Sequence, residues 1–441
     1  MDQRHFFISR QEMIENDLFD FYRKQLKENI LGFWLPRCED KEFGGYLNCF
    51  DNRGEHLASY DKYTWSQGRF LWLFSRLATT PVSIFTDAER AEFLRLAHSG
   101  AEFLRKHCLL ENEEKCVFLM DREGNPKEVS AGAPLDMSIY ADCFAVIGMG
   151  AYSYATSNKW AFDFALSLYE SIKQRVSSGD YRTLPYPLSP RFRAHGIPMI
   201  LSNTARELLR ASDVFYTEAS DVLKKDIWDY SSDIMEHFVD RNDVLHEIIT
   251  RDNEFFPQLL GQHQNPGHTI EDAWFHLDAA LVCNDDTYKE KIFRIVKKTL
   301  VNGWDREYGG FLHFCGVDGG EPFGQNVGFE NEPMSLQLSG WGDKLWWVHS
   351  ESLYTTLRCY FESGDKDFFE WYEKIQEYVF STFPNPDSSI GEWIQIRTRD
   401  GRPQEKVVAL PVKDPFHIAR NFLLILELLQ KRISLLSPQS K

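Results

Sequence analysis

The chain has 441 residues, a formal net charge of −17 and a hydrophobic share of 43%, which is enough apolar material to fill a large core. The acidic balance argues against a nucleic-acid partner and an anionic membrane surface, because phosphate binding needs clustered Lys and Arg. No stretch approaches the roughly 20 consecutive apolar residues of a membrane-spanning helix, so we expect no membrane segment.

Long amphipathic segments with apolar residues at helical spacing predict about twelve helices. No low-complexity linker interrupts them, so residues 1–441 are treated as a single domain. In chain order, the predicted helices lie near residues 10–30, 61–79, 86–108, 134–156, 160–178, 198–214, 218–239, 268–283, 286–302, 343–363, 367–383 and 414–435.

Shorter Gly- and aromatic-rich pieces between these helices repeat weakly. The two clearest begin at Gly32 and Asn302, and each has a tryptophan, a charged turn, an aromatic residue, Gly-Gly and an alternating run. Fainter copies begin at Cys116, Val244 and Gly391. Alternation followed by a Gly-containing turn predicts β-hairpins.

The repeating unit is therefore helix, helix, short hairpin, with a period of about 50 to 70 residues. Six helix pairs predict a closed (α/α)6 barrel, an all-α toroid with apolar inner helices and amphipathic outer ones. The hairpins would gather at one end and roof a central cavity. An open helical solenoid is the alternative.

The eight cysteines are scattered and none forms a CxxC pair. This favours free thiols in a reducing compartment over disulfides or a zinc site. The first thirteen residues contain no apolar segment like that of a signal peptide. We therefore expect a cytoplasmic location.

Several sequence motifs of catalysis are missing. There is no GxxxxGK(S/T) phosphate loop, no GxGxxG after a strand, no GxSxG and no HExxH. His263 and His268 are five residues apart, a poor spacing for chelation on a helix. We expect no metal site.

Arg69 is the first candidate site residue along the chain. It lies in an apolar helical segment between Trp65 and Trp72. A buried guanidinium is costly without a partner. That partner is either a carboxylate or a ligand.

His268 follows Pro-Gly at the predicted start of a helix. The positive end of the helix dipole there favours a neutral imidazole that can act as a base. Glu271, three residues on, shares its helix face and could orient the ring or touch a substrate hydroxyl. Alternatively, His268 caps the helix and Glu271 completes the cap.

Two adjacent tryptophans, Trp346 and Trp347, precede His349 and Glu351. Trp347 and Glu351 are four residues apart and share a helix face. An aromatic ring over a carboxylate suits a sugar, whereas core packing of both tryptophans is the alternative.

His417 lies in the first turn of the last predicted helix, three residues before Arg420. The cation disfavours the charged form of the imidazole and offers an anchor for negative charge on a substrate oxygen. A surface His–Arg pair is the alternative.

Together these segments resemble the N-acylglucosamine 2-epimerase family, to which cellobiose 2-epimerases and mannose-type aldose isomerases are related. The resemblance extends from Gly32 to Asn421 and rests on QGRFLWLFSRL, SIYADCFAV, PGHTIE, KLWWVHSE and PFHIAR. IPMILSNTARELL is more similar to the N-acylglucosamine branch, because Asn203 stands where the cellobiose branch is expected to have histidines.

The resemblance implies an (α/α)6 barrel that interconverts N-acetylglucosamine and N-acetylmannosamine, or a related aldose pair, through an enediol or enolate. It implies His268 and His417 as the acid/base pair. The implied substrate-binding residues are Arg69, Asn203, Glu271, Trp346, Glu351 and Arg420.

One His would remove the C2 proton and the other would return a proton to the opposite face, with Arg69 stabilising the charge on the C1 oxygen. We expect His417 to act on the gluco epimer and His268 on the manno epimer. No cofactor is required by this chemistry. Some family members are activated by ATP, but no phosphate-loop motif supports ATP activation of this chain. A homodimer stays open.

An aldose–ketose isomerase is the nearest alternative function, since it shares proton removal at C2. A glycoside hydrolase on the same barrel would use paired carboxylates, for which the candidates are Asp61, Asp136, Asp142, Glu271 and Glu351. A non-catalytic partner protein is the third alternative.

Overall fold

Helices dominate the computed structural model, which describes residues 10–215, 218–407 and 410–436. Each of the twelve predicted helices is present. They are α1 (Arg10–Lys24), α3 (Thr64–Thr79), α4 (Asp87–His107), α5 (Ile139–Thr156), α6 (Lys159–Ser178), α7 (Gly196–Phe215), α8 (Ala219–Asp233), α9 (Pro266–Cys283), α10 (Lys289–Gly303), α12 (Trp346–Ser363), α13 (Lys366–Thr382) and α14 (Phe416–Leu436).

Short helical turns extend or connect these helices. Two π-helical turns, η1 (Gln25–Leu31) and η2 (Ile234–Phe238), continue α1 and α8, so both predicted helices run to their expected ends. The remaining short elements are α2 (Gly32–Trp34), η3 (Leu259–Gly261), α11 (Pro333–Gln337) and η4 (Leu338–Gly340).

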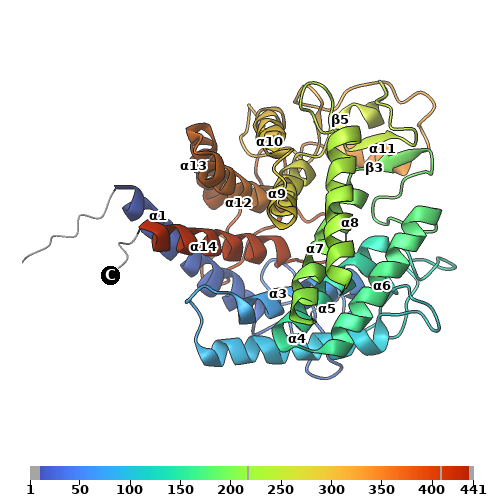
Figure 1. Cartoon of the computed structure of the whole chain (residues 1–441), viewed down its shortest axis with the longest axis vertical. Coiled ribbons are helices and arrows are strands. Elements are labelled where there is room, and N and C mark those ends of the chain that lie inside the picture. The colour runs from blue at the N-terminus through green and yellow to red at the C-terminus, as the bar shows by residue number, and fades with distance from the viewer. Residues whose placement is uncertain (1–9, 216–217, 408–409, 437–441) are drawn as a thin grey trace, which may run out of the picture.

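Six of the long helices form a closed inner ring. Helix α3 contacts α5, and the contacts continue through α7, α9, α12 and α14 back to α3. Each inner helix pairs with an outer one, in the order α4, α6, α8, α10, α13 and α1. The last helix thus lies beside the first, as Figure 1 shows for α14 and α1. The (α/α)6 prediction is confirmed and the open solenoid is wrong.

Burial separates the two rings. Fourteen of the eighteen residues of inner helix α5 are buried, from Ile139 to Ser153. Outer helix α6 buries seven of twenty, at spacings of three and four such as Ala161, Ala165 and Leu168, as expected for an amphipathic surface helix. One hydrophobic core includes residues from all twelve long helices.

Four two-stranded antiparallel sheets lie where the inner helices begin. They pair β1 (Lys62–Tyr63) with β2 (Leu119–Met120), β3 (Phe192–Ala194) with β4 (Ile248–Thr250), β5 (His263–Gln264) with β6 (Cys315–Gly316), and β7 (Lys344–Leu345) with β8 (Ile396–Arg397). Each sheet therefore joins the residues before an inner helix to those after its outer partner.

The predicted hairpins are present as tight turns closed by single bridges, such as Glu39 with Tyr46 and Trp304 with Phe311. The regular two-stranded sheets, however, join strands that are separated in sequence by an inner helix and its outer partner, for example Lys62 opposite Met120. The sequence predicts the turns correctly but not these long-range partners.

The two clearest sequence repeats build the same buried ion pair twice. Lys62 Nζ lies 3.0 Å from Asp40, and Lys344 Nζ lies 3.0 Å from Asp305. Both lysines are fully buried, and burial lowers the pKa of Lys344 to about 8 despite its carboxylate partner. The weak repeat is thus a structural duplication that anchors α3 and α12.

The eight cysteines are free, and seven of them are buried. Within the described ranges, none of the helices combines the length and the apolar composition needed to cross a lipid bilayer.

Candidate active site

Two histidines from distant parts of the chain line one cavity at the end of the ring where the inner helices begin. His268 lies in the first turn of α9 and His417 in the first turn of α14. Five other predicted site residues line the same cavity: Arg69, Asn203, Glu271, Trp346 and Arg420.

The indole of Trp347 packs against both imidazoles. Its ring centroid is 5.4 Å from that of His268 and 5.5 Å from that of His417. The two imidazoles therefore line one cavity and contact the same aromatic ring.

Hydrogen bonds fix the tautomer of His417. Its Nδ1 lies 2.7 Å from Glu351 Oε1, which can only accept, so Nδ1 carries the proton. Arg420 lies 3.2 Å from the same nitrogen but binds the same carboxylate oxygen at a shorter distance. Arg69 Nη2 donates to Nε2 at 3.2 Å. His417 is thus neutral, with the lone pair on Nε2.

Glu351 is fully buried behind His417 and does not face the cavity. Besides His417, its oxygens accept hydrogen bonds from Arg420 at 2.5 Å, Asn421 at 2.8 Å and Trp274 at 2.9 Å. Although burial opposes ionisation, the charge of Arg420 and these donors lower the pKa of Glu351 to about 2. Glu351 therefore positions His417 and, unlike the other predicted substrate-binding residues, does not line the cavity.

His268 is held in a similar way by a residue that the sequence did not indicate. Its Nδ1 lies 2.8 Å from Glu247 Oε1, which can only accept, so Nδ1 carries a proton. Burial opposes ionisation, but the charge of His268 and hydrogen bonds keep the pKa of Glu247 far below its usual range. The cap of α9 is Asn265, whose side chain accepts from the His268 backbone N–H at 3.2 Å. The capping alternative for His268 is wrong.

Glu271 has a different partner from the one predicted. It forms an ion pair with Arg420 and lies 3.9 Å from His417 Nδ1. The short spacing to His268 along the helix predicted an orienting contact, but the guanidinium from α14 is the stronger attraction for a buried carboxylate.

The partner of Arg69, which the sequence left open, is the carboxylate of Asp414. The guanidinium also packs against the rings of Trp65, Phe144 and Phe416, at 5.1, 4.3 and 5.0 Å from their centroids. Arg69 lines the cavity as well. A fixed cation thus lies beside His417 Nε2.

Trp346 and Trp347 both line the cavity, and Trp347 contacts both histidines. His349 is a core residue, and its Nε2 accepts a hydrogen bond from the Phe311 backbone N–H at 2.9 Å. Asn203 lines the cavity, and its Oδ1 accepts from Arg206 at 3.0 Å.

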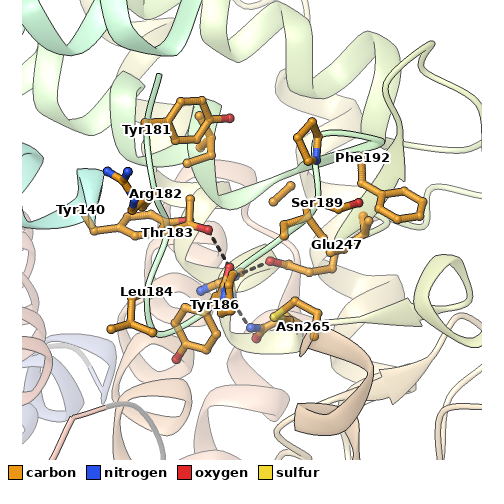
Figure 2. Close-up of a pocket in the computed structure, with 18 of the residues that line it drawn as sticks. Tyr140, Tyr181, Arg182, Thr183, Leu184, Tyr186, Ser189, Phe192, Glu247 and Asn265 are labelled. Atoms are coloured by element: carbon orange, nitrogen blue, oxygen red, sulfur yellow. Dashed lines mark hydrogen bonds and ion pairs between the residues drawn. The ribbon is translucent and has the colours of Figure 1, made fainter. Parts of the chain in front are cut away.

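A second cavity adjoins the first and shares Tyr140, Tyr186 and His268 with it. Figure 2 shows Tyr140, Tyr186 and Glu247 on its walls, with the hydrogen bond of Glu247 drawn. His268 therefore lies at the junction of the two spaces, and a bound molecule has room to extend from one into the other.

Two groups of residues have the composition of metal ligands: His195, Glu247 and His268, and Glu271, Glu351 and His417. In the second group Arg420 already occupies both carboxylates. In the first, the carboxylate holds His268. Protein cations thus use the donor atoms that an ion would need, and we propose no metal there.

Comparison with known proteins agrees with this architecture. The model of the family N-acylglucosamine 2-epimerase (GlcNAc 2-epimerase) matches residues 45–420. The N-acylglucosamine 2-epimerase of Bos taurus is 29% identical over 94% of this chain and 92% of its own length. The cellobiose 2-epimerase of Ruminococcus albus is 23% identical over 90% of this chain and 95% of its own.

A solved structure, the cellobiose 2-epimerase from Spirochaeta thermophila, has a TM-score of 0.75 at 16% identity and covers 96% of this chain and 100% of that one. The fold is thus that of the (α/α)6-barrel carbohydrate epimerases, which are isomerases. Because the family model spans most of its length, the chain belongs to the N-acylglucosamine 2-epimerase family.

Proposed function

We propose that the chain is a 2-epimerase that interconverts N-acetylglucosamine and N-acetylmannosamine. Its bovine relative is named an N-acylglucosamine 2-epimerase and is more similar to it than the Ruminococcus albus cellobiose 2-epimerase is. Asn203 on the cavity wall supports the same branch, in the place of the histidines expected for a disaccharide substrate.

The observation that carries the proposal is that His268 and His417 line one cavity, both contact Trp347, and each has a carboxylate at Nδ1. Inversion at C2 needs a base on one face and an acid on the other, because one base tends to return the proton to the face it came from. In each direction one imidazole must be neutral, with the Nε2 lone pair as the base, while the other carries a proton on Nε2 as the acid, and imidazole can take both forms near pH 7. We assign His417 to the gluco epimer and His268 to the manno epimer.

Removal of the C2 proton moves negative charge onto the C1 oxygen of the open-chain sugar. Arg69 supports this step, because its guanidinium lines the cavity 3.2 Å from His417 Nε2. A preorganised donor aimed at developing charge is worth about 3–4 kcal/mol. The base and the cation thus lie side by side, as proton removal α to a carbonyl requires.

The carboxylates of the cavity argue against glycoside hydrolysis. A hydrolase needs one carboxyl with a raised pKa to protonate the leaving oxygen. Glu271 and Glu351 are both paired with Arg420, and the pKa of Glu351 is lowered to about 2. Glu351 therefore stays ionised and cannot act as an acid at neutral pH, and Glu271 is bound to the same guanidinium.

The test is to incubate the purified protein with N-acetylmannosamine, mannose and cellobiose in D₂O and to identify the products by NMR. We expect N-acetylglucosamine with deuterium at C2. Fructose from mannose would instead show the aldose–ketose isomerase, and no turnover on any of the sugars would refute the proposal.

The chemistry proposed above uses protein groups alone. Repeating the assay with and without ATP tests whether a nucleotide activates the enzyme. Light scattering of the purified chain tests the expected homodimer.

A further inference from the structure

A series of buried ionisable groups extends from His268 away from the cavity, and the mechanism above does not use it. Glu247 binds His268 through Oε1, and its other oxygen, Oε2, lies 3.6 Å from His195 Nδ1. Among the described residues neither of these last two atoms has a hydrogen-bond partner. His195 Nε2 donates to Asp272 Oδ2 at 2.9 Å. His195 therefore lies between two carboxylates.

The backbone holds His195 and Glu247 in this position. His195 directly follows β3 and Glu247 directly precedes β4, and these two strands pair with Ala194 opposite Ile248. The His195 backbone N–H donates to the Glu247 carbonyl at 2.9 Å. The small sheet thus extends by one pair, which places the imidazole beside the carboxylate that holds His268.

The surroundings of His195 favour its charged form. Nε2 donates to Asp272, and Nδ1 lies 3.6 Å from Glu247 Oε2, too far for a hydrogen bond but within the range of an ion pair. Burial opposes this charge, but Asp272 and Glu247 outweigh it and raise the pKa of His195 to about 9. His195 is fully buried, and the rings of Phe238 and His268 lie 6.0 and 6.3 Å from its ring.

The two catalytic histidines thus differ in what neutralises their carboxylates. Glu351, behind His417, is paired with the guanidinium of Arg420, which is charged at every accessible pH. Glu247, behind His268, faces an imidazolium that can lose its proton. The positive charge behind His417 is therefore permanent, whereas the positive charge behind His268 depends on pH.

Building on the proposed function, we propose that His195 is a positioning residue for the His268 half of the reaction. Its imidazolium, held between Asp272 and Glu247, keeps Glu247 ionised and so fixes His268 with the proton on Nδ1. His195 does not line the catalytic cavity, and it acts on the sugar only through Glu247 and His268.

Loss of the imidazolium has a defined chemical consequence. Asp272 would keep His276 at 2.9 Å, whereas Glu247 would keep only His268, so desolvation would favour protonation of Glu247. A protonated Glu247 can donate to His268 Nδ1, which places the ring proton on Nε2. His268 then cannot accept the C2 proton, although His417 is unaffected.

The test uses His195→Gln and deuterium isotope effects measured from both epimers, each labelled at C2. We expect turnover to fall by about 10²- to 10⁴-fold, the usual contribution of general acid–base catalysis. The step at His268 then limits the rate. The isotope effect should therefore rise for the epimer that His268 deprotonates and fall toward one for the other epimer.

Asn421→Ser is the matched variant, because it removes a donor from Glu351 on the His417 side and should shift the two isotope effects in the opposite sense. A second variant, Asp272→Asn, should lower the pH at which turnover is lost in alkali, since it lowers the pKa of His195. The groups facing His195 in that titration are Glu247 at the start of β4, and Asp272 and His268 on α9.

An equal change in both isotope effects, or an unchanged alkaline limit in a folded Asp272→Asn protein, would overturn the assignment of His195 while leaving the epimerase intact. Loss of epimerisation by the unmodified protein on every sugar tested would instead overturn the proposed function.

Discussion

Nε2 of His417 lies 3.2 Å from Nη2 of Arg69, in a hydrogen bond where the guanidinium can only donate. The contact that leaves the lone pair on His417 Nε2 also places a guanidinium beside that nitrogen. Proton removal and stabilisation of the resulting charge thus depend on adjacent groups from opposite ends of the chain.

Arg69→Gln should lower kcat by about 10²- to 10³-fold, because a donor for the developing oxyanion is lost. KM should change much less, since the charge is absent from the ground state. Steady-state kinetics on N-acetylmannosamine measures both. Arg76→Gln is the control: Arg76 lies two turns along α3, pairs with Glu427 and packs over Trp72 away from the cavity. A comparable fall in kcat for both variants would contradict the role of Arg69.

Stability should depend on acid through Glu351. Its pKa in the folded protein is about 2, below that of an unfolded glutamate, so folding favours the ionised form. The stabilisation is complete above about pH 4.5 and is lost as the pH falls toward 2. Urea unfolding between pH 7 and pH 3 measures it.

Glu351→Gln should reduce this acid dependence and destabilise the protein by about 3–5 kcal/mol at pH 7, because a buried cation loses a partner. Glu290→Gln, at an exposed position of α10, should cost less than about 0.5 kcal/mol. An unchanged urea midpoint in Glu351→Gln would show that the buried network contributes nothing to stability.

A single added methyl group in one of the duplicated loops should lower the free energy of unfolding. Gly310 has a φ of +69°, and a Cβ there would overlap the ring of Tyr378. Gly310→Ala should therefore destabilise by about 1–2 kcal/mol for the backbone and by about 1–3 kcal/mol more for the overlap. Gly320→Ala, with a φ of +73° and open space around it, should show the first cost alone. Equal melting temperatures for the two variants would contradict this reading of the packing.

Most of the fold could be predicted from the sequence. The helices are long, and their apolar spacing is determined by which ring each belongs to, as α5 and α6 illustrate. The sheet partners could not be predicted, because strands of two or three residues carry too little pattern. Their register is set by the helix pairs that they flank.

The sequence predicted the residues that line the cavity but not those behind them. His268 and His417 lie in the first turns of helices and Arg69 lies one turn into α3, and all three line the cavity. Glu247 and His195 were missed because they are 52 positions apart and meet only through β3 and β4. No local spacing indicates such a contact.

Proton exchange in His268→Asn and His417→Asn tests the two-base account most directly. Each variant should lose epimerisation by at least about 10²-fold, yet each should still exchange the C2 hydrogen of one epimer with D₂O, and the two variants should retain opposite epimers. Full epimerisation by either variant, or exchange of the same epimer by both, would contradict the account.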